Sequence, residues 1–409
     1  MDAFDIAAMR ACLDLATLGP AADPNPRVGC VVTSADGAIA GGGYHRGSGT
    51  AHAEVAALSD AAANGSDVRG GTAYVSLEPC AHTGRTGPCA DALVAAGVTR
   101  VVVLRRDPGD QSGGGAARLT EAGAAVDVLP DLLAAAAARA TGTVIGPARD
   151  SARAAAIDAT DLPVLSAIAE RAAEIVEPWE CATRHGRPFV TWKYAATLDG
   201  RSAARDGSSR WITGEAARAD VHARRATAGA VVVGTGTVLA DDPALTVRDA
   251  TDAPVAVQPL RVVVGERDLP ATAQVFASSG ATGAADPALH LRTRDVHEVL
   301  AALHDRRIRH VWLEGGPSLA AAFLAAGLVD EIVGYVAPAL LGAGPTAIGD
   351  LGIDSIDGIA RFDLRSVDRV GGDVRLVLRP ARAATPDTQS PPGNGDHSNR
   401  ENHPERQEP

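Results

Sequence analysis

The chain has 409 residues, of which 46% are hydrophobic and 22% are charged, as in soluble globular proteins of two or three domains. Its net charge of −12 and its aromatic content of 3% argue against a nucleic-acid partner, which needs basic residues for phosphates and rings for base stacking. Short, interrupted apolar runs, an acidic N-terminus and only five cysteines predict a cytoplasmic protein with no membrane span, secretion signal or disulfide framework.

The first 130 residues alternate helical and strand patterns, which predicts a layered α/β domain. We expect helices over residues 5–18, 52–63 and 90–96, and strands over residues 28–34, 72–77 and 99–104. The next segment, 131–184, is rich in alanine and carries no strand pattern or chemical motif. It is predicted to be a helical connector between two domains.

A second α/β pattern occupies residues 185–380. Strands are expected over residues 189–193, 230–233, 260–264, 310–313, 331–336 and 369–378, and helices over 215–226, 296–305 and 318–326. Residues 381–409 contain almost no apolar side chains, so this tail cannot bury a core and is predicted to be disordered.

The first domain contains a set of potential metal ligands in a characteristic order. His52 and Glu54 stand two residues apart, Cys80 follows a proline, and Cys89 comes after eight further residues. One imidazole and two thiolates are good Zn²⁺ ligands, and three protein ligands leave a fourth position for a reactive water. Glu54 can take that water's proton and hand it to a departing amine. A lone His-x-Glu or a lone cysteine would mean little, but the ordered combination predicts a zinc-dependent hydrolytic deaminase.

Residues 23–29, 43–47, 52–55 and 78–89 resemble the deaminase half of the bifunctional riboflavin-biosynthesis deaminase/reductase family. The resemblance implies a cytidine-deaminase-like three-layer fold. It also implies a substrate, 2,5-diamino-6-(5-phosphoribosylamino)pyrimidin-4-one, whose ring 2-amino group is replaced by water. Contacts to the pyrimidine or its phosphate are implied for Asn25, His45, His82 and Arg85. The alternative is that Asn25 shapes a turn between two prolines and that the other three are solvated loop residues.

Three positions depart from the pattern of that family. Asp23 replaces a histidine, Gly87 replaces a proline before Pro88, and Gly109 replaces an asparagine that contacts substrate. None of these changes affects the zinc ligands. They put the substrate affinity or selectivity of the deaminase half in question.

The second half contains glycine-rich turns that follow expected strands. Gly234 and Gly236 suggest a dinucleotide fingerprint, but Leu239 stands where its third glycine belongs. The Glu314-Gly-Gly-Pro turn precedes a helical pattern, which suits either a phosphate or an ordinary strand–helix connection. Together with residues 191–201 and 209–213, these segments resemble the reductase domain of the same family. That resemblance implies a dihydrofolate-reductase-like fold, NADPH as cofactor and reduction of the ribosyl group to ribityl, giving 5-amino-6-(5-phosphoribitylamino)uracil.

Matching positions imply roles for residues of the second half. Those expected near the cofactor are Ala196, Trp211, Thr237, Asp241 and Gly316. Those expected in the substrate pocket are Lys193, Ser209, Arg225, Leu245, Arg248 and Glu314. Arg225 and Arg248 are expected to hold phosphate because a guanidinium binds oxygens in pairs. Lys193 is the single lysine of a chain that otherwise uses arginine, so either it survives by chance or it donates to the sugar during reduction.

The leading hypothesis is therefore a bifunctional enzyme with Zn²⁺ and NADPH as cofactors, acting on a pyrimidine nucleotide. The resemblance also implies a homo-oligomer formed through the reductase domain. One alternative is a protein whose reductase alone works, with a weakened deaminase half. Others are a nucleic-acid-editing deaminase and a non-catalytic regulatory protein, which would have no use for an open zinc site beside Glu54.

Overall fold

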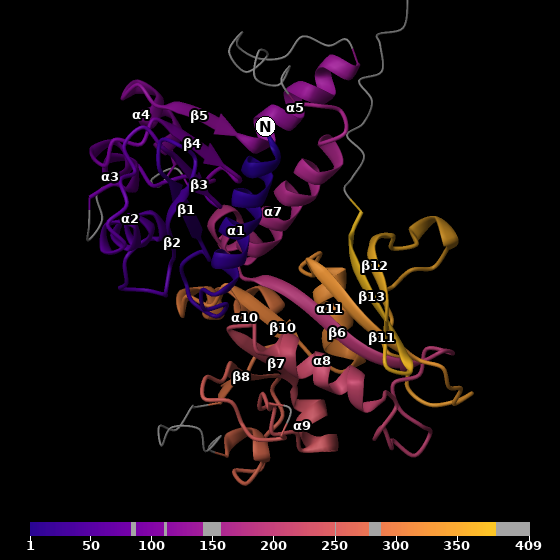
Figure 1. Cartoon of the computed structure of the whole chain (residues 1–409). Coiled ribbons are helices and arrows are strands. Elements are labelled where there is room, and N and C mark those ends of the chain that lie inside the picture. Colours follow the sequence, from indigo (N-terminus) through magenta and orange to yellow (C-terminus); the bar gives the residue numbers. More distant parts are fainter. Residues whose placement is uncertain (83–86, 110–112, 142–156, 250, 278–287, 382–409) are drawn as a thin grey trace, which may run out of the picture.

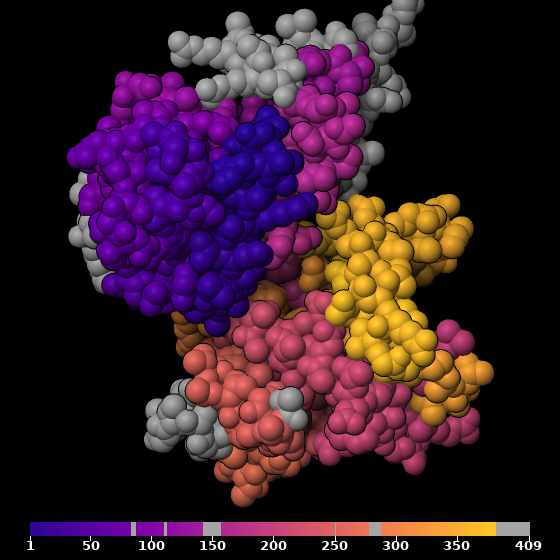
Figure 2. All heavy atoms as spheres, viewed as in Figure 1, coloured from indigo at the N-terminus to yellow at the C-terminus, as the bar shows by residue number. Residues whose placement is uncertain are grey.

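The computed structural model describes residues 1–82, 87–109, 113–141, 157–249, 251–277 and 288–381. Two α/β domains are visible in Figure 1, the first coloured indigo to purple and the second pink to yellow. Helix α7 (Leu162–His185) runs from the first domain to the second. The space-filling view in Figure 2 shows the two domains packed against each other. The tail predicted over 381–409 lies, apart from residue 381, outside the described residues.

The first domain is built on a five-stranded mixed sheet in the order β2-β1-β3-β4-β5. Its strands are β1 (Gly29–Thr33), β2 (Ile39–Tyr44), β3 (Thr72–Val75), β4 (Arg100–Val103) and β5 (Ala125–Val128). β1 is antiparallel to both neighbours, whereas β3, β4 and β5 run parallel. The three strands expected in this domain are confirmed, and β2 and β5 are additional.

Helices cover both faces of this sheet, so the expected three-layer α/β fold is confirmed. The helices are α1 (Ala3–Thr17), α2 (Ala53–Ala63), α3 (Cys89–Ala95), α4 (Gly115–Glu121) and α5 (Leu129–Ala140). α2, α3 and α4 share one apolar core with the sheet. α1, α5 and α7 share the core on the opposite face. Helices α5 and α7 of the expected connector therefore supply part of the second helical layer.

Strand β2 contains three consecutive glycines, and two of them face helix α2. A Cβ atom on Gly43 would lie 2.4 Å from the Ala57 backbone nitrogen, and one on Gly41 would lie 2.6 Å from the Ala57 carbonyl oxygen. Real Cβ atoms do not approach other atoms so closely. Only glycine therefore allows α2 to pack directly on this strand. Because α2 begins next to His52, this packing also fixes the position of the metal-ligand motif.

The second domain is built on an eight-stranded mixed sheet in the order β12-β13-β11-β6-β10-β7-β8-β9. The strands are β6 (Phe189–Thr197), β7 (Ala230–Gly234), β8 (Leu260–Val264), β9 (Leu289–Leu291), β10 (His310–Leu313), β11 (Glu331–Ala337), β12 (Phe362–Val370) and β13 (Asp373–Pro380). The helices are α8 (Glu215–Arg225), α9 (Thr235–Asp241), α10 (Val296–Asp305) and α11 (Pro317–Ala325), with short 3₁₀ turns at Gln274–Phe276 and Ile356–Gly358.

This sheet is also covered on both faces. α10 and α11 pack on one face, and α8 and α9 pack on the other. The five strands expected before the last one are confirmed. The expectation of a single final strand over 369–378 is wrong, because Gly371, with φ of +63°, makes a turn inside this range. The turn joins β12 and β13 into an antiparallel hairpin.

Helix α7 is tied to both domains by ion pairs one helical turn apart. Glu180 is 6% exposed and accepts two hydrogen bonds from Arg105, at 2.8 and 2.7 Å. Glu177 accepts from Arg379 of β13 at 2.6 Å. The two-point contact with Arg105 and the single bond from Arg379 hold α7 to both domains. Among the described residues, no helix is long and apolar enough to cross a membrane.

We predict that Gly43→Ala damages the zinc site through the packing of α2. The added methyl must push the helix away, at a cost of about 1–3 kcal/mol in the free energy of unfolding. Bound zinc per chain should fall, as measured by atomic absorption, and the unfolding midpoint in urea should fall with it. Gly42→Ala is the matched control, because its Cβ meets only the end of the Leu15 side chain, at 3.1 Å. Equal zinc content in the two variants would contradict the argument.

Candidate functional site

The three expected metal ligands lie together at the N-terminal ends of two helices. His52 is the N-cap residue of α2, Cys89 is the first residue of α3, and Cys80 lies in the loop that follows β3. Their ligand atoms all lie within 4.8 Å of one another. His52 Nδ1 is 3.2 Å from Cys89 Sγ and 3.7 Å from Cys80 Sγ. Among the described residues, this is the one cluster of three or more such side chains.

The spacing and chemistry of these atoms suit Zn²⁺. A tetrahedral zinc with bonds of about 2.3 Å to sulfur and about 2.0 Å to nitrogen separates its ligand atoms by about 3.5–3.8 Å. A hydrogen bond from the Cys89 side chain lowers the pKa of Cys80, and burial opposes this effect. The same bond raises the pKa of Cys89. A thiol whose pKa is lowered reaches the thiolate form more easily, and the thiolate is the form that binds a metal.

Glu54 lies in the first turn of α2 with its side chain 3% exposed. Burial raises the pKa of its carboxyl group, which favours the protonated form more than in water. A carboxyl group with a raised pKa holds a proton more readily than an ordinary glutamate, which suits a group that accepts a proton and then returns it. This is the property that the predicted proton-transfer role requires.

Asn25 and His45, expected to contact substrate, are hydrogen-bonded to each other, and the His45 ring contacts the ring of the ligand His52. His45 Nδ1 donates to the Ala51 carbonyl oxygen at 3.1 Å, which leaves its Nε2 as the acceptor for the Asn25 amide at 3.2 Å. The His45 ring then meets the His52 ring edge-on, with centroids 5.6 Å apart. Asn25 is thus more than a turn residue, because its side chain also holds the His45 ring in place.

The substituted position Asp23 has a structural task in this loop. Its carboxylate accepts from the Asn25 backbone N–H at 2.9 Å and from the Ser48 N–H at 2.8 Å. These bonds join the loop that carries Asn25 to the loop after β2. Aspartate at this position therefore supports the geometry of the site.

The remaining deaminase positions that the structure describes follow β3 and β4 along the chain. His82 is exposed, and Arg85 lies outside the described residues. Gly109 follows β4, where its N–H bonds to the Asp107 side chain at 2.8 Å. The buried carboxylate of Glu78 accepts from the backbone N–H groups of Asp107 and Ala116, at 3.3 and 2.9 Å. Glu78 was not among the expected residues, although its place two residues before Cys80 is a usable signal.

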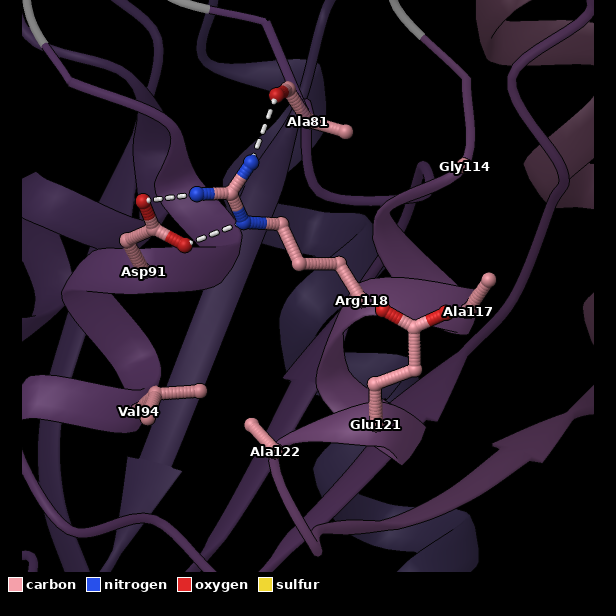
Figure 3. A pocket seen from close by; sticks show the side chains of 8 residues that line it. All are labelled: Ala81, Asp91, Val94, Gly114, Ala117, Arg118, Glu121 and Ala122. Carbon is pink, nitrogen blue, oxygen red and sulfur yellow. Dashed lines mark hydrogen bonds and ion pairs between the residues drawn. The ribbon is translucent and has the colours of Figure 1, made fainter.

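An open hollow lies between α3 and α4, beside the loop that begins at Cys80 (Figure 3). Arg118 crosses it, bonding to the Asp91 carboxylate at 2.6 Å and to the Ala81 carbonyl oxygen at 3.3 Å. The residues that line it are Ala81, Asp91, Val94, Gly114, Ala117, Arg118, Glu121 and Ala122. None of them is a metal ligand, so this hollow is separate from the zinc site. Arg118 links α4 to α3 through Asp91 and to the start of the cysteine loop through Ala81.

In the second domain, Lys193, Arg225 and Glu314 lie together. β6 and β10 are parallel with Trp192 beside Leu313, which places Lys193 next to Glu314 at the end of β10. Glu314 accepts from Arg225 through both oxygens, at 2.9 and 3.0 Å, and from the Trp312 indole at 2.7 Å. Arg225 also donates to the Thr246 carbonyl at 2.7 Å. In this structure Arg225 therefore orients Glu314, in addition to any contact with phosphate.

The charges in this cluster influence one another. Burial lowers the pKa of Lys193, and the positive charge of Arg225 adds to this effect while Glu314 opposes it. Burial alone would raise the pKa of Glu314, but the charges of Arg225 and Lys193 hold it below its usual value. Glu314 is therefore an anion beside an ammonium group that gives up its proton more readily than an ordinary lysine.

Of the residues expected near the cofactor, Thr237 and Gly316 follow the carboxyl ends of β7 and β10. Thr237 is in the first turn of α9, and a Cβ on Gly316 would lie 3.5 Å from its Oγ1. Asp241 ends α9, and its carbonyl accepts from Arg210 at 2.7 Å. Ala196 is buried in β6, and Trp211 is 69% exposed with Arg218 stacked 4.4 Å from its ring centre. Thr237 and Gly316 are thus adjacent.

The other expected substrate residues are less tightly grouped. Leu245 is buried with φ of +55°, which turns the chain towards Thr246 and Arg248. Arg248 donates to the Asp252 carbonyl at 2.8 Å, and its side chain is 37% exposed. Ser209 is partly exposed in the loop before Trp211. Leu245 is therefore the one of these three that is fixed in the core.

Arg267 was not expected and lies beside the same turns. It follows β8, its Nε is 3.4 Å from Thr235 Oγ1, and its Nη2 lies 2.8 Å from where a Cβ on Gly236 would be. In the described part of the chain, no carboxylate lies within 4.0 Å of it. The usable signal was an arginine just after a buried parallel strand, since ligands of α/β sheets bind at the carboxyl ends of strands.

Comparison with known proteins identifies both domains. Residues 3–105 match the family model described as the cytidine and deoxycytidylate deaminase zinc-binding region, and residues 188–376 match the RibD C-terminal domain. A riboflavin biosynthesis protein RibD from Mycobacterium tuberculosis is 44% identical, over 87% of this chain and 91% of its own length. RibD from Escherichia coli is 36% identical, over 87% and 93%.

Solved structures show the same two-domain arrangement. Acinetobacter baumannii RibD matches with a TM-score of 0.72 and 34% identity, covering 93% of this chain and 99% of that one. A diaminohydroxyphosphoribosylaminopyrimidine deaminase/5-amino-6-(5-phosphoribosylamino)uracil reductase from Thermotoga maritima matches with a TM-score of 0.73 and 29% identity, covering 92% and 99%. With one site in each half, the chain belongs to the RibD family, the bifunctional deaminase/reductase enzymes of riboflavin biosynthesis.

Proposed function

We propose that the first domain hydrolyses the 2-amino group of 2,5-diamino-6-(5-phosphoribosylamino)pyrimidin-4-one. The cluster of His52, Cys80 and Cys89 beside buried Glu54 is the observation that carries this proposal. His52, Cys80 and Cys89 would hold a zinc ion, which would make a water a stronger nucleophile near neutral pH. Glu54 accepts the proton of the water and then protonates the departing nitrogen, so that ammonia leaves. Asn25 and His45, with the loop residues His82 and Arg85, orient the pyrimidine and its phosphate.

We propose that the second domain then reduces the ribosyl group to ribityl, giving 5-amino-6-(5-phosphoribitylamino)uracil. NADPH supplies the hydride. Lys193 donates a proton to the opened sugar, and its lowered pKa makes this donation easier. The negative charge of Glu314 stabilises the ammonium group of Lys193, and Arg225 orients the Glu314 carboxylate. Ser209, Leu245 and Arg248 line the substrate pocket.

The cofactor of this domain is proposed to be NADPH rather than NADH. Ala196, Trp211, Thr237, Asp241 and the Gly316 turn would hold it. Arg267 lies beside Gly236 with no carboxylate within 4.0 Å in the described ranges, so its guanidinium is free to bind a phosphate. A 2′-phosphate is the group that separates NADPH from NADH. The position of Arg267 therefore supports the phosphorylated cofactor.

We also propose domain limits, an assembly and a location. The deaminase domain is residues 1–130, the connector 131–184 and the reductase domain 185–380. Edge strand β12 exposes Leu364 and Val367, which are 57% and 56% exposed, and a second copy pairing there would cover them.

Two cysteine ligands need a reducing compartment, which supports the cytoplasm. The net charge of −12 opposes a nucleic-acid partner, which needs a basic surface.

The weakened-deaminase alternative depends on Gly109. The loop around it is held by Glu78, and the metal cluster and Glu54 are intact. These observations favour two working sites. Ammonia release by the purified protein decides between the two readings.

Glu54→Gln is predicted to lower kcat for deamination about 10²–10⁴-fold, because the amide cannot carry the proton. Zinc content should stay at one per chain. The reductase, assayed with deaminated substrate and NADPH, should be unchanged. Deamination at more than a tenth of the normal rate would contradict the role given to Glu54.

Lys193→Met is predicted to lower kcat of the reductase about 10²-fold with little change in KM for NADPH. Lys193→Arg should be impaired as well, because the larger group does not fit a buried space built around an ammonium. Steady-state oxidation of NADPH measures both, and deamination serves as the internal control. Full turnover by Lys193→Arg would show that the lysine has no special part.

Arg267→Leu is predicted to raise KM for NADPH about tenfold and to leave KM for NADH unchanged, because only NADPH loses a charged contact. Arg292→Leu is the matched control, since Arg292 is an exposed arginine that pairs with Asp268 at 2.7 Å. Equal changes for the two cofactors would mean that Arg267 does not read the 2′-phosphate.

A further inference from the structure

The two domains touch at a loop of the deaminase site. Arg309, just before β10 of the reductase domain, donates from Nε to the Pro24 carbonyl oxygen at 3.1 Å. The two residues are 285 positions apart in the sequence. Figure 1 shows the blue end of the first domain meeting the second domain near α10 and β10. Pro24 immediately precedes Asn25, which is proposed to contact the substrate.

Arg309 is not held in position by an ion pair with a nearby carboxylate of the described residues. In the described ranges, no carboxylate lies within 4.0 Å of its guanidinium. Burial lowers its pKa, and the positive charge of neighbouring Arg307 lowers it further. A half-buried cation without an anionic partner needs other acceptors, because desolvation is costly. The Pro24 carbonyl is the acceptor that the deaminase domain provides.

The loop that Arg309 reaches has little freedom of its own. Asn25 lies between Pro24 and Pro26, whose rings fix φ and restrict the residue before each of them. Asp23 accepts from the Asn25 N–H and from the Ser48 N–H, which closes the loop on its other side. A shift of the Pro24 carbonyl therefore moves Asn25 as well.

From Asn25 the contacts continue to the metal site. The Asn25 amide donates to His45 Nε2 at 3.2 Å, and the His45 ring lies edge-on to the ring of the ligand His52. Arg309 is thus three contacts from a metal ligand of the other domain. None of the residues that connect them belongs to the reductase site.

We infer that Arg309 of the reductase domain is a positioning residue for the deaminase site, holding the Pro24–Asn25 loop in its substrate-binding position. Docking of the second domain thereby sets how tightly the first domain holds its pyrimidine nucleotide. The inference rests on the proposed contact of Asn25 with the substrate. It concerns binding, so the effect belongs in KM more than in kcat.

The test compares Arg309→Met with Arg306→Met in the full chain. Methionine keeps the length of the side chain and removes its donors. Arg306 is the matched control, because it is exposed and donates to the Ala302 carbonyl of its own helix. We expect KM for deamination to rise about tenfold in Arg309→Met only. Zinc content and reductase activity should be unchanged. Hydrogen exchange, followed by mass spectrometry, should become faster in residues 20–28.

Arg309→Lys keeps a charged donor and should recover most of the affinity. Arg309→Leu, which also lacks a donor, replaces Arg309→Met if that variant does not fold. Combining Arg309→Met with Asn25→Ala should raise KM no more than Asn25→Ala alone, because both changes act on one contact. An unchanged KM in Arg309→Met, or fully additive effects, would overturn the inference. An unchanged KM in Asn25→Ala as well would remove the proposed substrate contact of Asn25, whereas zinc-dependent ammonia release would still stand.

Discussion

The close approach of helix α2 to strand β2 is the constraint on which the zinc site depends. Gly41 and Gly43 let the helix backbone rest directly on the strand, where any side chain would collide. The distance between the start of the helix and the sheet is therefore fixed, and with it the positions of His52, the N-cap residue, and Glu54, in the first turn. Cys80 and Cys89 arrive from β3 and α3, on the same side of the sheet. The site takes residues from α2, from the loop after β3 and from α3, and backbone packing thus determines where it lies.

The second site is located by strand register and by charge. β6 lies near the middle of the eight-stranded sheet, and its pairing with β10 sets Lys193 beside Glu314. Arg225 then fixes both oxygens of Glu314, so the anion cannot turn away from the ammonium. Thr237 and Gly316, which are proposed to hold the cofactor, follow the neighbouring strands β7 and β10. The two sites are therefore positioned in different ways, although both domains use a sheet covered by helices on both faces.

The sequence predicted the parts of the structure that depend on local pattern. The apolar runs of β8 and β10 and the amphipathic α10 end where expected. Strand β2 was missed because three consecutive glycines do not resemble a strand. The glycines are needed because helix α2, which comes later in the sequence, packs directly on this strand. The hairpin of β12 and β13 was missed because the turn at Gly371 interrupts an otherwise strand-like pattern. The metal ligands were predictable from ordered spacing. The bond from Arg309 to Pro24 was not, because only the folded chain brings those residues together.

The most direct test of the whole account follows both reactions in one sample. The purified protein with bound zinc is incubated with the diaminopyrimidinone nucleotide, first without NADPH and then with it. Ammonia should appear in the first stage, and NADPH oxidation should begin only when NADPH is added and should reach one equivalent per ammonia. Absence of ammonia in both stages would contradict the claim that this chain carries a working deaminase beside its reductase.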